Sequence, residues 1–191
     1  MVLRESHWRF NTSAGIGIGF GAFKSESGMF ALDAPSGQTY EYIYGGFGVG
    51  TSRGLATLLR IPRLALPKVL VKSDELSGSG STADFTSRGR LYLTDSFKGN
   101  DLTNPQSLEG GTIYLEGAAG YLFGGTGSFM LLGIHADLLL MAIVKPDLIG
   151  MAICSAPAAL IVGGVNEGLQ DAVGFAFMCG KIKCNGLYVD G

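Results

Sequence analysis

Apolar residues alternate with glycine along three stretches of the chain. In residues 15–21 every second position is glycine, and Ile16 and Ile18 stand between glycines. Residues 40–50 repeat this pattern, with tyrosine and then glycine at one set of alternate positions and mostly apolar residues at the other. Residues 112–132 form a third pair of apolar runs around a glycine-rich centre. A period of two is typical of β-strands, so these stretches predict three β-hairpins or strand pairs.

Shorter signals extend the β-rich region. Residues 27–32 and 90–94 predict two more strands, and the Ala-Pro-Ser-Gly sequence at 34–37 predicts a turn. Residues 1–128 are therefore expected to form a glycine-rich β domain, either a sandwich or a small barrel. Glycine inside a strand costs stability and marks a sharp bend or a close approach by another backbone or ligand. Two explanations stay open: a tightly curved sheet, or a smooth surface for another chain or for lipid.

The C-terminal third is more continuously apolar. Residues 129–144 are interrupted only by His135 and Asp137, and residues 148–165 carry no charge. Each run lies near the lower limit of about 17 residues for a membrane span. Asp137 favours the helix dipole if it lies near a helix start, and His135 can titrate near pH 6. The pair is a candidate pH sensor, and the alternative is two partly hydrated side chains of an ordinary helix.

These runs predict an apolar helical hairpin within residues 129–180, packed on the β domain or inserted in a membrane. Residues 181–191 then form a C-terminal tail. Residues 173–178 are equally compatible with a last strand. The expected fold class is mainly β with this C-terminal hairpin, and α+β overall.

Small residues recur at a spacing of four along the predicted hairpin. In a helix this spacing places each of two rows on its own stripe, which permits close helix contact inside a folded domain or in a membrane. The candidate residues for membrane insertion or helix contact are Ala152, Ser155, Ala156, Ala159, Gly163, Gly164 and Gly168.

A cationic segment lies between the second and third glycine-rich stretches. Residues 53–72 contain five basic residues and no acidic one, interleaved with leucine, isoleucine and valine. An anionic lipid surface attracts such a segment by about 1 kcal/mol per basic residue, although long basic side chains also cover ordinary cores with their stems. The candidate contacts for anionic lipid or a partner are Arg53, Arg60, Arg63, Lys68 and Lys72.

Composition narrows the function classes. Of 191 residues, 47% are apolar and 16% are charged, which excludes a disordered chain. The net charge of −2 gives no general electrostatic basis for nucleic-acid binding. The N-terminus lacks the apolar core of a secretory signal, and three cysteines form no disulfide framework. We expect synthesis in the cytoplasm without a Sec signal.

Catalytic motifs are missing from the sequence. It contains two histidines, no H-E-x-x-H, no G-x-S-x-G and no P-loop, so no enzyme activity, metal or cofactor is predicted. A loose dinucleotide fingerprint at Gly17 and Gly19 lies in an alternating strand rather than before a helix, and it is rejected.

The sequence therefore predicts a small membrane-active protein, a bacterial effector or pore-forming toxin that inserts into or permeabilises a target membrane. Export by a dedicated secretion machine suits such a protein. The expected partners are membrane lipid, a chaperone or immunity protein, and further copies of the chain in a homo-oligomer. The alternative is a soluble β-sandwich or barrel module that binds lipid, another apolar ligand or a protein partner.

Overall fold

The computed structural model describes residues 1–20, 23–51, 70–71, 80–82, 85–116, 127–163 and 175–188. Within these residues, most of the regular structure is β-strand. The strands are β1 (Val2–Phe20), β2 (Phe23–Asp33), β3 (Thr39–Thr51), β4 (Leu70–Val71), β5 (Gly80–Thr82), β6 (Phe85–Leu93), β7 (Gly110–Glu116), β8 (Gly127–Ile134), β9 (Ala158–Gly163) and β10 (Phe175–Leu187). The helices are α3 (Ala136–Val144), α4 (Ile149–Ser155) and the 3-10 turns η1 (Pro105–Leu108) and η2 (Pro146–Leu148).

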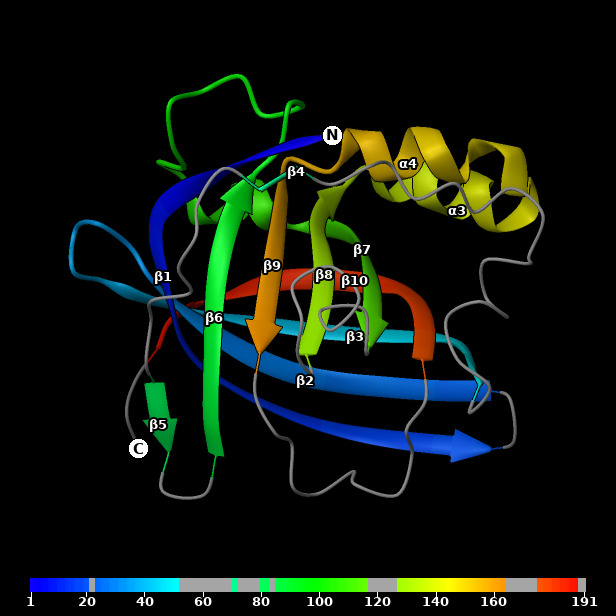
Figure 1. Cartoon of the computed structure of the whole chain (residues 1–191), viewed down its shortest axis with the longest axis horizontal. Coiled ribbons are helices and arrows are strands. Elements are labelled where there is room, and N and C mark those ends of the chain that lie inside the picture. The colour runs from blue at the N-terminus through cyan, green and yellow to red at the C-terminus, as the bar shows by residue number, and fades with distance from the viewer. Residues whose placement is uncertain are drawn as a thin grey trace.

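The main strands close into an antiparallel barrel. Their order is β1-β2-β3-β10-β7-β8-β9-β6, and β6 pairs back with β1 to close the ring of eight (Figure 1). The short strands β4 and β5 add to β1 and β6 at the margins. The prediction of a mainly β fold is confirmed, and of its two forms the structure has the barrel. The predicted turn at 34–37 is also confirmed, because the Gly37 amide donates to the Ala34 carbonyl at 2.9 Å.

Large apolar side chains fill the barrel interior. They form one contiguous cluster to which seven of the eight ring strands contribute buried apolar residues, and Tyr114 of β7 packs against it, as expected when alternate residues point inward. Within this cluster, Phe30 and Tyr42 stack with ring centroids 5.2 Å apart. The principal members are Trp8, Phe10, Phe30, Leu32, Tyr42, Leu91, Leu93, Met130, Leu132, Leu160 and Ile182.

Two glycine positions show why the sheet needs residues without a side chain. Gly46 of β3 pairs with Gly180 of β10, and a Cβ atom at Gly46 would lie 2.8 Å from the Cys179 carbonyl oxygen. On β6, a Cβ atom at Gly89 would lie 2.5 Å from the Phe10 ring. At these positions glycine permits close packing inside a curved sheet, as the first explanation from the sequence proposes.

The C-terminal apolar region differs from the predicted helical hairpin. Phe129 begins no helix but lies in β8. In the described part of residues 129–180, helix is limited to α3, η2 and α4, and β9 and β10 are strands. The reason is that both faces of β8 and β9 are buried. In β8, Met130 and Leu132 belong to the interior cluster, whereas Phe129 and Leu131 belong to a second cluster outside the barrel wall. A strand buried on both faces has the same continuous apolar sequence as a buried helix.

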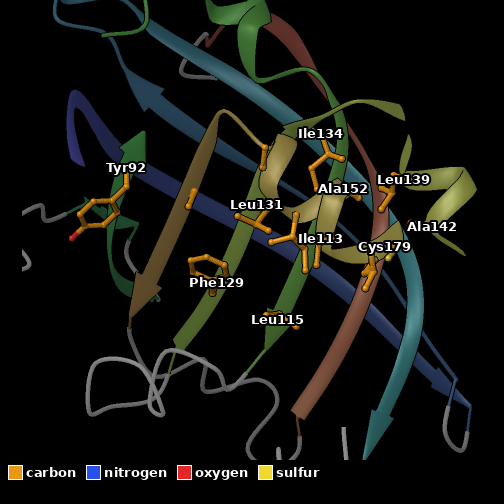
Figure 2. Close-up of a cluster of buried hydrophobic side chains, with 14 of the residues drawn as sticks. Tyr92, Ile113, Leu115, Phe129, Leu131, Ile134, Leu139, Ala142, Ala152 and Cys179 are labelled. Atoms are coloured by element: carbon orange, nitrogen blue, oxygen red, sulfur yellow. The ribbon is translucent and has the colours of Figure 1, made fainter. Parts of the chain in front are cut away.

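The second cluster joins the two helices to the barrel wall. Figure 2 shows Leu139, Ala142 and Ala152 of the helices beside Ile113, Leu131 and Cys179 of the strands, and all six are buried. Helices α3 and α4 lie next to each other on one side of the barrel (Figure 1). Among the described residues, no helix has the length and hydrophobicity required to cross a bilayer.

Candidate functional site

Helix α3 is apolar on nearly all sides, and half of it faces outward. Its sequence, ADLLLMAIV, contains Asp137 as its one charged residue. Leu139 and Ala142 are buried against the barrel, at 4% and 3% exposure. On the other side Leu140 is 55% exposed and Val144 is 79% exposed. A helix that is apolar on all sides is normally buried, so this exposed apolar side is unusual for a folded protein in water.

Helix α4, which is in contact with α3, also exposes an apolar side chain. Met151 is 60% exposed, while its neighbours Ala152 and Ile153 are buried at 0% and 1%. We call the exposed apolar residues of the two helices the helix-pair surface. It consists of Leu140, Met141, Ile143, Val144 and Met151.

Local sequence makes both helices short. His135 stands at the N-cap of α3 without a side-chain capping bond, and Asp137 lies in the first turn, where its charge favours the helix dipole. Pro146 then starts η2, which separates the two helices. With 9 residues in α3 and 7 in α4, and a rise of 1.5 Å per residue, each is about 14 Å or less in length. That is about half of a bilayer's hydrocarbon core of ~30 Å.

Small residues bring the helices close to the barrel. A Cβ atom on Gly111 of β7 would lie 2.8 Å from Leu139 Cδ2, so the missing side chain makes room for α3. The end of α4 is held by hydrogen bonds: Ser96 Oγ donates to the Ser155 carbonyl at 3.0 Å, and Thr94 Oγ1 donates to the Ala156 carbonyl.

The residues predicted from the spacing of four do not form one stripe. Ala152 lies in α4, Ala156 follows it, and Ala159 lies in β9, because the helix ends before Pro157. All three alanines are fully buried, so they pack the second cluster rather than face outward. Ser155 is the last residue of α4 and Gly163 the last of β9. Gly164 and Gly168 lie outside the described residues.

Some of the other candidate residues predicted from the sequence lie within the described residues, and the rest lie outside them. The basic residues Arg53, Arg60, Arg63, Lys68 and Lys72 all lie outside the described residues. His135 and Asp137 are exposed at the start of α3, next to the helix-pair surface. Their role as a pH sensor stays a prediction.

A polar cluster at the N-terminal end of β1 was not predicted. Asp101 accepts hydrogen bonds from Ser6 Oγ at 2.6 Å and from the His7 amide at 2.8 Å, and His7 Nδ1 lies 2.6 Å from the same carboxylate. Partial burial raises the pKa of Asp101, but the bonds from Ser6, His7 and the Leu102 amide outweigh this effect and hold it below its usual value. Nucleophilic catalysis needs a histidine between serine and aspartate, whereas here both bind the carboxylate directly. The cluster therefore fastens β1 to the segment after β6.

Among the described residues, the cysteines and the potential metal ligands form neither a metal site nor an activated thiol. In the part of the chain that the structure describes, no group of three histidine, cysteine or acidic side chains is placed to hold a metal ion. Cys179 and Cys184 are buried and Cys154 is exposed, all as free thiols. Burial raises the pKa of the Cys179 thiol to about 11, so it stays protonated at neutral pH.

Comparison with known proteins identifies the family. The chain is 30% identical to the toxin protein Tse4 of Pseudomonas aeruginosa over 192 aligned positions, which cover 95% of this chain and 96% of that protein. The chain belongs to the Tse4 toxin family. This membership confirms the prediction of a bacterial toxin or effector. No protein-family model matches the sequence of the present chain, and no solved structure matches this chain either.

For a Tse4-family toxin, the helix-pair surface is the strongest candidate site. The sequence predicted an apolar segment here, but it did not predict which residues stay exposed. That information depends on which side of α3 rests on the barrel, and the buried pair Leu139 and Ala142 settles it.

Proposed function

We propose that this Tse4-family toxin acts on a target membrane and makes first contact through the helix-pair surface. The supporting observation is the 44–79% exposure of five large apolar side chains on two adjacent short helices. Fully burying one such side chain is worth roughly 1.5–3 kcal/mol, so partial insertion of all five provides several kcal/mol. Helices of this length suit a position in the membrane interface, with their apolar side among the upper acyl chains.

Permeabilisation then needs a further step. The barrel interior holds Trp8, Phe30 and Tyr42 in a packed cluster, so the folded barrel has no open passage at that level. We propose that the membrane-bound toxin either associates with further copies or rearranges part of its structure. No enzyme activity or cofactor enters this proposal.

Delivery and protection follow from the toxin family. We propose export by a dedicated secretion machine to a target cell, because the chain belongs to a family of bacterial toxins. In the producing cell, an immunity protein or chaperone would cover the helix-pair surface. Such a partner would bury the same side chains that otherwise meet lipid.

Dye release from anionic vesicles tests the proposal. The unaltered toxin should release dye, and the double variant Leu140→Gln with Val144→Gln should release several-fold less while unfolding at the same urea concentration. The matched control places the same change at two exposed apolar residues elsewhere, Val2→Gln with Leu187→Gln, and should keep full activity. Vesicles left intact by the unaltered toxin would contradict the proposal.

The alternative function, binding of an apolar ligand inside the barrel, has less support. Among the described residues, a pocket bordered by Tyr44, Thr112 and Tyr114 has a volume of about 10 Å³. That space holds about one water molecule. A binding function would therefore use the outer surface, and a stable complex with a protein partner without any vesicle leakage would favour it.

A further inference from the structure

A second exposed apolar pair lies on the outer face of β3. The strand alternates as its sequence predicts: Tyr42 is fully buried in the interior cluster, and Ile43 and Phe47 are 46% and 64% exposed outside. An exposed phenylalanine on a barrel wall is costly in water, because most of its apolar area stays hydrated. The helix-pair surface does not explain it.

Two lysines stand beside this pair on the neighbouring strand. Lys181 and Lys183 of β10 are exposed, while Ile182 between them is buried in the interior at 3% exposure. The strand register sets Lys183 opposite Ile43, and it sets Cys179 opposite Phe47. We call Ile43, Phe47, Lys181 and Lys183 the lysine–aromatic face.

This face borders the helix pair. Cys179, the cross-strand neighbour of Phe47, belongs to the same buried cluster as Leu139 and Ala142 of α3, and Figure 2 shows Cys179 close to Ala142. Lys181 pairs with Gly111, the glycine over which Leu139 packs. Directly opposed residues have Cβ atoms about 4.5–5.5 Å apart. The lysine–aromatic face therefore lies next to the part of the barrel wall on which α3 packs.

We infer that the lysine–aromatic face docks on an anionic phospholipid surface, with Phe47 below the headgroups and Lys181 and Lys183 at their level. The inference rests on the proposed membrane function and adds an orientation and a lipid class to it. Strands rise about 3.3 Å per residue, so Phe47 lies roughly 7 Å beyond Lys181 along the barrel wall. Apolar side chains at membrane interfaces reach depths of about 5–10 Å, which matches this separation.

Local charge favours an anionic partner. The acidic residue nearest the lysines along β3 is Glu41, and its Oε1 accepts a hydrogen bond from Asn185 Nδ2 at 2.6 Å. Glu41 keeps its charge in this bond, so two lysines against one carboxylate leave this part of the wall with a net positive charge. Each basic residue near an anionic membrane is worth about 1 kcal/mol, and the attraction weakens with salt.

Vesicle co-sedimentation tests the charge component. On vesicles of phosphatidylcholine with added phosphatidylglycerol, Lys181→Gln and Lys183→Gln should each weaken binding about fivefold. Lys98→Gln removes another exposed lysine, away from this face, and should change nothing. On vesicles of phosphatidylcholine alone, all four proteins should bind alike. Equal binding of the two variants and the unaltered toxin to the anionic vesicles would overturn the inference.

A fluorescent probe tests the orientation. In a Cys154→Ser background, where the remaining cysteines are buried, an environment-sensitive label is attached in turn at Phe47→Cys, Asn185→Cys and Val144→Cys. On anionic vesicles, position 47 should shift to shorter wavelength and position 185 should not. A shift at 144 without one at 47 would overturn the inference and leave the proposed function standing. A shift at position 47 without dye release by the unaltered toxin would overturn the proposed function and leave the inference standing. No shift at position 47 or at position 144 would overturn both the inference and the proposed function.

Discussion

The barrel interior and the helix pair are both built from apolar residues, but the chain uses them in opposite ways. In the interior, Phe30, Tyr42 and Leu132 are at most 1% exposed. On the helix pair, Val144 is 79% exposed and Met151 is 60% exposed. Hydrophobic burial stabilises the barrel, whereas the helices keep apolar area that no described part of the chain covers. The difference separates the region that holds the fold from the region available to another surface.

Polar groups show the same contrast. Around the barrel, Trp8 Nε1 donates to the Leu102 carbonyl at 2.9 Å, and the Tyr42 hydroxyl donates to the Pro105 carbonyl at 3.0 Å. Burial is the main cause of a strongly raised pKa for Tyr42, so this hydroxyl stays neutral. The N-caps of α3 and α4 have no side-chain capping bond. Short helices with few such bonds are expected to open at lower free energy than the barrel.

The largest expected effect comes from emptying the interior. Phe30→Ala should lower the free energy of unfolding by about 3–5 kcal/mol, because it removes a buried ring stacked on Tyr42. Leu187→Ala, at a position 57% exposed, is the control and should change it by less than about 0.5 kcal/mol. Urea unfolding followed by the fluorescence of buried Trp8 measures both. Similar losses for the two variants would remove the contrast between interior and surface.

The next largest expected difference in stability is between alanine substitutions at two glycines, Gly180 in the sheet and Gly150 in α4. Gly180→Ala should destabilise the protein by up to about 3 kcal/mol, because its new Cβ atom would meet the backbone of Gly45 and Gly46. Gly150→Ala in α4 meets nothing within 4 Å and should stabilise the helix by up to about 1 kcal/mol. Thermal unfolding of both variants checks the opposite signs. A harmless Gly180→Ala would show that the sheet does not need this close approach.

The Asp101 cluster should give a smaller, pH-dependent effect. Asp101→Asn weakens the bonds from Ser6 and His7, and we expect a loss of about 1–2 kcal/mol at neutral pH. Since folding lowers the pKa of Asp101, the carboxylate stabilises the fold above its unfolded-state pKa of about 3.9. That contribution disappears as the pH falls below about 4 and through the folded-state value. Unfolding of both proteins between about pH 7 and pH 2 should therefore show their difference shrinking in acid.

Much of the barrel could be predicted because its alternation is local. Tyr42 inside and Ile43 outside follow from a period of two, and the turn at Gly37 follows from its glycine, which has a φ of 83°. β8 and β9 could not be told from helices, since residues on both of their faces are buried, by the interior on one side and the second cluster on the other. Only the pairing of distant strands decides between the two structures.

The candidate site was predicted less completely, for a related reason. The apolar run through α3 is visible in the sequence, but the exposure of Leu140 and the burial of Leu139 depend on which side meets Gly111. The bond between His7 and Asp101 joins residues 94 positions apart, and no local pattern announces it. Both features arise from tertiary packing rather than from spacing.

The smallest expected effect on stability lies on the helix pair, and it sharpens the comparison most. Val144→Ser with Met151→Ser should change the free energy of unfolding by less than about 0.5 kcal/mol per site, because both side chains are mostly hydrated in the folded protein. Ile153→Ala, two residues after Met151 but at a position 1% exposed, should cost about 2–5 kcal/mol. If the helices serve a membrane rather than the fold, the serine pair should nevertheless reduce dye release from anionic vesicles. A stability loss above about 1 kcal/mol for the serine pair would mean that these side chains pack within the chain, and the helix pair would then belong to the same class as the interior.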